Sequence, residues 1–96
     1  MTDIDAFIVR VKDVGWKVAR APHHELEPKH GDVVTCPGDP TAYHVTAIHK
    51  NLAHLIADET DTTVWVPMDD VTVSVRRRDG IWLDVRPTPH TEAPHD

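Results

Sequence analysis

The chain has one cysteine, four glycines and few aromatic residues, and it lacks a long apolar run. Because Cys36 is alone, an internal disulfide and a metal site that needs two cysteines are both excluded. Its apolar strand pattern is typical of an inert buried thiol. No apolar run approaches the roughly 18 residues of a membrane span, and residues 1–5 lack the features of a signal peptide. We therefore expect a cytoplasmic protein that makes no contact with membranes.

Positive charge is also scarce, and the excess acid lies in the second half of the chain. Ten Lys and Arg residues stand against sixteen Asp and Glu residues, which gives a net charge of −6. Residues 1–57 have a net charge of −1 and residues 58–96 a net charge of −5. Since nucleic-acid-binding modules usually have a basic surface, the first half is the part whose charge remains compatible with RNA.

The first 57 residues predict an α-β-β-β-α unit. Apolar residues of 3–14 recur at helical spacing, and short strands are expected at residues 16–20, 23–27 and 32–36. A second helix is expected from residue 40 to 57, because its apolar residues form one helical stripe: Val45, Ile48, Leu52, Leu55 and Ile56. The expected fold class is therefore α+β, with two helices on one face of an antiparallel sheet.

Residues 58–86 predict a C-terminal β extension. Valines alternate with polar residues from 71 to 75, and Asp79-Gly80 is a hairpin turn signal, so a hairpin is expected over residues 71–86. Residues 87–96 hold three prolines and no large apolar side chain, which predicts a disordered tail.

The order and spacing of several motifs in residues 4–56 match a known family. A helix is followed by GWKVAR at residues 15–20, two histidines (His23 and His24) open the next strand, and Gly31 comes eight residues after the first histidine. On these motifs the block resembles the HicA family of toxin–antitoxin systems, with relatives in actinobacteria and their phages. These toxins are messenger-RNA-cleaving ribonucleases with a fold like that of double-stranded-RNA-binding domains.

The resemblance implies a metal-independent endoribonuclease with His23 as its catalytic residue. Histidine serves as general acid or base because its pKa lies near the working pH. Strand alternation would place Glu25 on the same open face, where its carboxylate could orient the ring. Arg20 or Lys17 would supply positive charge to the phosphate, with His24 as a weaker support. The alternative is that both histidines are ordinary residues of a strand surface.

Other polar and aromatic groups have two interpretations each. Arg76-Arg77-Arg78 could contact phosphate or form a solvated sheet edge, and the three tryptophans could stack on bases or occupy half-buried sheet positions. Three histidines (His44, His49 and His54) lie five residues apart, which separates them by about 140° on a helix. We therefore expect no metal and no cofactor.

Two further hypotheses compete with the ribonuclease. The acidic extension, and the absence of the family's Gly-Ser before His23, favour a non-enzymatic protein-interaction module, such as a phage-encoded inhibitor of a host protein. The expected partner is RNA in the first case, and a protein such as an antitoxin or a host protein in the second. A third hypothesis places residues 31–75 in a small SH3-like barrel, which requires strand rather than helix over residues 43–56.

Overall fold

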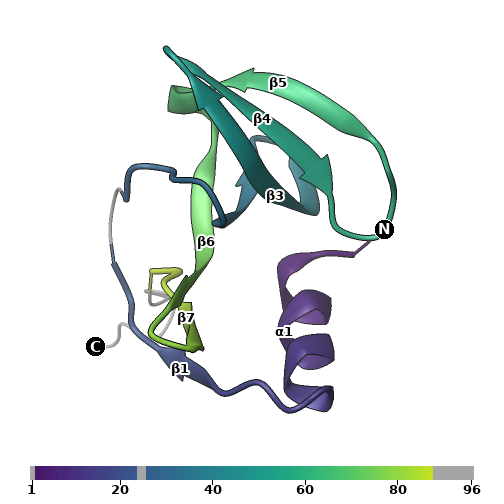
Figure 1. Cartoon of the computed structure of the whole chain (residues 1–96), viewed down its shortest axis with the longest axis vertical. Helices are drawn as coiled ribbons and strands as arrows, with labels where there is room; N and C mark the ends of the chain where they lie inside the picture. Colours follow the sequence, from purple (N-terminus) through teal and green to yellow (C-terminus); the bar gives the residue numbers. More distant parts are fainter. Residues whose placement is uncertain (1, 24–25, 88–96) are drawn as a thin grey trace, which may run out of the picture.

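The computed structural model describes residues 2–23 and 26–87, which form one helix and one seven-stranded sheet (Figure 1). The helix is α1 (Ile4–Asp13), and a 3-10 helix, η1 (Met68–Asp70), precedes β6. The strands are β1 (Val18–Arg20), β2 (Val33–Cys36), β3 (Asp39–His49), β4 (Leu52–Ala57), β5 (Thr63–Pro67), β6 (Thr72–Arg78) and β7 (Ile81–Asp84). The α+β class is therefore confirmed. No helix in the described part of the chain has the length and apolarity to cross a membrane.

The sheet has the strand order β1-β7-β6-β2-β3-β4-β5. All neighbouring strands are antiparallel except β1 and β7, which run parallel. The strands expected as an extension therefore do not form a layer of their own, because β5, β6 and β7 lie in the same sheet as the earlier strands. The predicted hairpin is present as β6 and β7, joined at Asp79 and Gly80, which both have positive φ. Residues 88–96 of the predicted tail lie outside the described residues.

Residues at both ends of α1 favour the helix and fix its limits. Asp3 caps it by accepting a hydrogen bond from the Ala6 amide at 2.8 Å, and Gly15 follows its end with φ of 102°. Its apolar stripe is buried against β2, β3, β6 and β7. Phe7, only 1% exposed, meets Trp82 edge-to-face with ring centroids 5.2 Å apart.

The predicted second helix over residues 40–57 is wrong, because this segment forms the hairpin of β3 and β4. A register shift between Val45 and Ala47 explains the misleading period. The extra residue of this bulge places Val45 and Ile48 on the same side of β3, three residues apart, as they would be on a helix. Lys50, with φ of 58°, forms the turn without the glycine that usually marks one. The described residues thus contain one helix against the sheet and not two.

The predicted second strand is also wrong in its described part. Residue 23 and residues 26–28 have no regular structure, and residues 24 and 25 lie outside the described residues. The first and third predicted strands are present as β1 and β2. Strand structure over residues 43–56 is what the SH3-like barrel hypothesis required, and β2 to β6 curl around one core.

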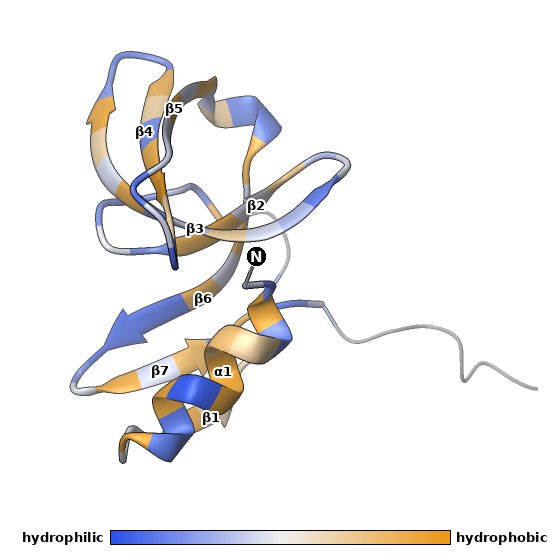
Figure 2. Ribbon diagram, turned by 90° about the vertical axis from the view of Figure 1, so that its right-hand side faces the viewer, coloured by the Kyte–Doolittle hydropathy of each residue, from blue (hydrophilic) through white to orange (hydrophobic). Residues whose placement is uncertain are grey.

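Two hydrophobic cores divide the molecule into an upper and a lower half (Figure 2). The upper core lies among β2 to β6, with Val85 added, and its buried members are Val34, Tyr43, Val45, Ala53, Leu55, Ala57, Val71, Val73 and Val85. The lower core lies between α1 and the sheet, and its buried members are Ile4, Phe7, Ile8, Val11, Val33, Ala42, Val75 and Trp82. Strand β6 contributes to both cores, so it joins the two halves.

Candidate functional site

The predicted catalytic histidine lies in an irregular segment after β1 and not on a strand. His23 is exposed, and its backbone N–H donates to the carbonyl oxygen of Val85 at 3.0 Å. Its expected partner Glu25, and also His24, lie outside the described residues. Because His23 itself is not part of a strand, strand alternation does not determine the direction of its side chain.

The two predicted cations do not join His23 in one site. The guanidinium of Arg20 donates to the backbone carbonyls of Arg86 at 2.6 Å and Asp84 at 3.1 Å, and it lies 3.4 Å from the Asp84 carboxylate. It therefore fastens β1 to the end of β7. Lys17 is exposed but precedes β1, whereas His23 follows it. Among the described residues, Arg20 is thus engaged by the end of β7, and Lys17 lies at the other end of β1 from His23.

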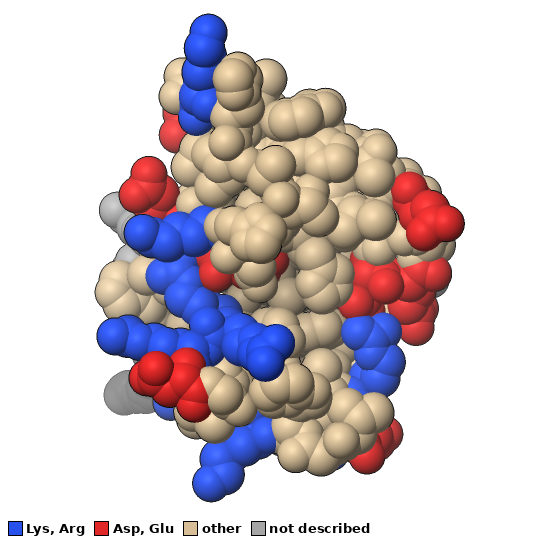
Figure 3. Space-filling view, viewed as in Figure 1, with Lys and Arg blue, Asp and Glu red and all other residues tan. Residues whose placement is uncertain are grey.

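The three consecutive arginines of β6 have different surroundings. Arg76 binds the buried carboxylate of Asp32 through two hydrogen bonds of 2.6 and 2.8 Å, which raise the pKa of Arg76. The guanidinium of Arg77 lies over the Trp16 ring, 4.3 Å from its centroid. Arg78 is exposed. Figure 3 shows Lys and Arg side chains gathered on the left of this face, with some Asp and Glu side chains among them, whereas Asp and Glu side chains predominate on the right.

A second surface, on the upper half, lacks charged side chains. From residue 41 to 57 the sole charged side chain is Lys50 at the turn, and residues 62–68 have none. Side chains at alternate positions of β4 are buried in the upper core, so the remaining ones face outward. We call this surface the uncharged face and define it by Thr46, Ala47, His49, Leu52, His54, Ile56, Thr63, Trp65 and Pro67.

Trp65 lies midway along β5, the outermost strand of the uncharged face. It is 54% exposed, whereas Trp82 is 9% exposed and Trp16 is half-buried. Its ring lies 4.7 Å from that of His54 on the neighbouring strand. Leu52, beside His54 on β4, is 41% exposed. An exposed tryptophan among uncharged neighbours is the least expected feature of this surface, because large aromatic side chains are mostly removed from water.

His54 is held in place by Thr46 on β3. The Thr46 hydroxyl donates to the backbone carbonyl of His54 at 3.1 Å and lies 2.6 Å from the ring Nδ1. These two contacts from one hydroxyl orient the His54 ring beside Trp65.

An ion-paired cluster borders the uncharged face where α1 covers the sheet. The carboxylate of Asp58 is 2% exposed and lies 2.6 Å from Arg10 Nη1 and 2.6 Å from His44 Nε2. Burial raises the pKa of Asp58, but hydrogen bonds from Arg10 and His44 lower it by more, so the pKa lies below its ordinary value. Because Arg10 belongs to α1 and His44 to β3, this cluster joins the helix to the sheet.

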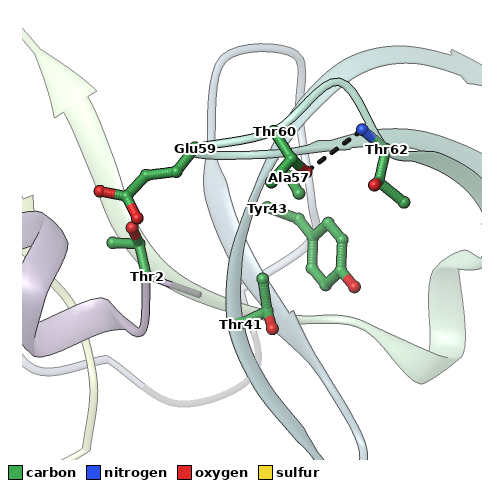
Figure 4. A pocket seen from close by; sticks show the side chains of 7 residues that line it. All are labelled: Thr2, Thr41, Tyr43, Ala57, Glu59, Thr60 and Thr62. Atoms are coloured by element: carbon green, nitrogen blue, oxygen red, sulfur yellow. Dashed lines mark hydrogen bonds between the residues drawn. The ribbon is translucent and has the colours of Figure 1, made fainter.

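A small pocket lies beside the turn between β4 and β5 (Figure 4). Its volume is about 260 Å³, and it is lined by Thr2, Thr41, Tyr43, Ala57, Glu59, Thr60 and Thr62. The hydroxyl of Thr2 is buried and has no hydrogen-bond partner among the described residues. The pocket is smaller than the usual site for a drug-sized ligand. Within the described ranges no group of three His, Cys, Asp or Glu side chains could hold a metal ion.

No family model, curated protein or solved structure matches this chain. The uncharged face was not predicted from the sequence, because residues 40–57 were expected to form a helix with a different set of neighbours. One signal was nevertheless present, since the two segments that form this face contain almost no charged residues.

Proposed function

We propose that the protein is a non-enzymatic protein-interaction module that binds its partner through the uncharged face. The exposure of Trp65 on that face is the observation that carries this proposal. Charged residues make up 27% of the chain, yet none lies among the residues that define the uncharged face. The centres of protein interfaces are likewise depleted in charge and enriched in aromatic residues, and tryptophan often supplies a large share of the binding energy.

The charges around this face favour a protein over RNA. Glu59 and Asp61 precede β5, and Asp69 and Asp70 follow it. Phosphate groups would be repelled at both ends of the strand, and contacts to phosphate supply a large share of the affinity of nucleic-acid-binding proteins.

RNA binding or cleavage of the HicA type remains the second candidate. It would use Lys17, Arg77 and Arg78, which are exposed cations of the lower half. The double-stranded-RNA-binding-domain-like form of this hypothesis would need a second helix where β3 and β4 lie. The supporting observation is the gathering of Lys and Arg side chains in Figure 3.

Capture from a bacterial lysate, with and without nuclease treatment, tests the choice between the two surfaces. Immobilised wild type is compared with Trp65→Ala and with Arg78→Ala, which changes an exposed side chain of the lower half. We expect a protein that is retained by wild type and Arg78→Ala and lost by Trp65→Ala. Capture that depends on Arg78 and disappears after nuclease treatment would instead support the RNA candidate.

A further inference from the structure

Strand β5 is the last strand of the sheet and leaves one edge without a partner. Among the strands of the described residues it pairs only with β4, in register throughout from Thr63 to Pro67. The Ala57 amide donates to the Thr62 carbonyl at 2.9 Å, and the Met68 amide donates to the Asn51 carbonyl at 2.7 Å. These two hydrogen bonds lie at opposite ends of the same antiparallel ladder.

The two bonds show which backbone groups of β5 face outward. In an antiparallel ladder, hydrogen-bonded and non-hydrogen-bonded pairs alternate. Counting inward from Thr62 and Met68, the backbone groups of Val64 and Val66 point toward β4. The N–H and C=O groups of Thr63 and Trp65 therefore point to the open edge, and no backbone group of the described residues pairs with them there.

The edge also lacks the devices that usually block the addition of another strand. Natural edges are protected by charged side chains, bulges, shortness or proline. Strand β5 has no charged residue and no bulge against β4. Its only blocking residue is Pro67, which lacks an N–H and so ends the usable edge. The opposite edge of the sheet, β1, is only three residues long.

Acidic residues stand at both ends of this uncharged edge. Glu59 and Asp61 come just before β5, and Asp69 and Asp70 come just after it. All four are exposed. A segment that extends along β5 would therefore meet an uncharged centre between two negative ends, which favours a complementary segment with positive ends.

We propose that β5 binds an extended segment of the partner protein as an eighth strand of the sheet. The segment has a short apolar centre, rich in β-branched residues, and Lys or Arg at each end. Its main chain pairs with Thr63 and Trp65, and one of its side chains packs on the Trp65 ring as a cross-strand neighbour. This inference rests on the proposed function and names the kind of partner that the uncharged face takes.

Selection of binders from a displayed library of linear peptides tests the inference with the full chain as target. The selected peptides are measured against Thr63→Pro and the matched variant Thr63→Val. Proline removes the N–H that points to the open edge, and this N–H makes no bond to β4. We expect a loss of roughly tenfold or more in affinity for Thr63→Pro and little change for Thr63→Val. Peptides with apolar centres and basic ends should dominate the selection.

Amide hydrogen exchange of wild type gives a measurement that does not depend on the folding of a variant. Addition of a selected peptide should slow exchange at Thr63 and Trp65 and leave Val64 and Val66 unchanged, because their amides are already bonded to β4. Peptides that bind Thr63→Pro as well as wild type but lose Trp65→Ala would overturn the eighth strand and leave the proposed function standing. Failure to select any binder, or equal binding to Trp65→Ala, would count against both.

Discussion

The two halves of the sheet differ in their charged side chains, which form ion pairs in the lower half and are missing from the outward side of β4 and β5 in the upper half. In the lower half, Arg20 and Arg86 are bonded to Asp84, and Arg86 also reaches Asp5 of α1 at 2.9 Å. In the upper half, the outward side of β4 and β5 has no charged side chain, although α1 does not cover it. Ion pairs in the lower half hold together segments that are distant in the sequence. Among the described residues, no ion pair forms on the uncharged face, and Trp65 on it stays exposed, which is why it is the better place to look for a partner.

The largest expected effect comes from cutting into the lower core. Phe7→Ala should lower the free energy of unfolding by about 3–5 kcal/mol, because the Phe7 side chain of α1 is fully buried against Trp82 of the sheet. Chemical denaturation measures this effect. Val9→Ala is the matched control on the same helix, since Val9 is 58% exposed and should change stability by about 0.5 kcal/mol or less. Equal effects from the two substitutions would contradict the position of α1.

The Asp58 cluster, at the border of the two halves, should make stability depend on acid. The folded-state pKa of Asp58 is lowered, so its stabilisation is present above the ordinary carboxyl pKa and is lost as pH falls through the lowered value. Asp58→Asn should lower the free energy of unfolding at neutral pH by about 1–3 kcal/mol.

Denaturation at a series of pH values checks the assignment to Asp58. The difference in stability between wild type and Asp58→Asn should shrink as the pH is lowered below the ordinary carboxyl pKa. A difference that stays constant down to strong acid would show that the charge of Asp58 contributes nothing.

Removal of a large aromatic side chain from the upper half should lower the free energy of unfolding much less than removal of one from the lower half. Trp65→Ala should lower the free energy of unfolding by about 1 kcal/mol or less, because more than half of the Trp65 surface is already in water. Thermal melts of Trp65→Ala and Phe7→Ala compare the two halves directly. A loss for Trp65→Ala as large as that for Phe7→Ala would mean that the uncharged face is part of the core.

The smallest expected effect is a gain in stability. Lys50 holds the turn between β3 and β4 with φ of 58°, a conformation that costs a side chain free energy. Lys50→Gly should relieve this cost and raise the free energy of unfolding by about 0.5 kcal/mol, after the greater entropy of glycine in the unfolded chain is subtracted. Lys50→Ala keeps the strain and serves as the control in the same denaturation series.

Features that depend on neighbouring residues could be predicted from the sequence. The cap at Asp3, the end of α1 before Gly15 and the turn at Asp79-Gly80 all rest on contacts within a few residues. The hairpin of β3 and β4 could not be predicted in the same way. Its bulge imitates a helical period, and the positive φ of its turn falls on Lys50, where a glycine would have given a clearer signal.

The candidate site could not be predicted, because it depends on contacts between residues that are distant in the sequence. Whether Trp65 faces water follows from the direction in which five strands curl, and no local pattern encodes that direction. The engagement of Arg20 and Arg76 likewise follows from partners 64 and 44 residues away. The sequence therefore suggested cations for a phosphate site, whereas the fold had already bound these two to its own carboxylates and carbonyls.

The parallel pairing of β1 with β7 sets the order in which the chain can fold during synthesis. All strands of the upper half, and β6 with them, leave the ribosome before β7 does, so they can assemble, and α1 can pack on β2, β3 and β6, before β7 is available. Strand β1 finds its partner only when residues 82–84 have emerged, and until then Phe7 lacks its contact with Trp82. Strand β1 is therefore the last strand to join the sheet, and a chain cut short before β7 would leave β1 unpaired and α1 without the Trp82 ring.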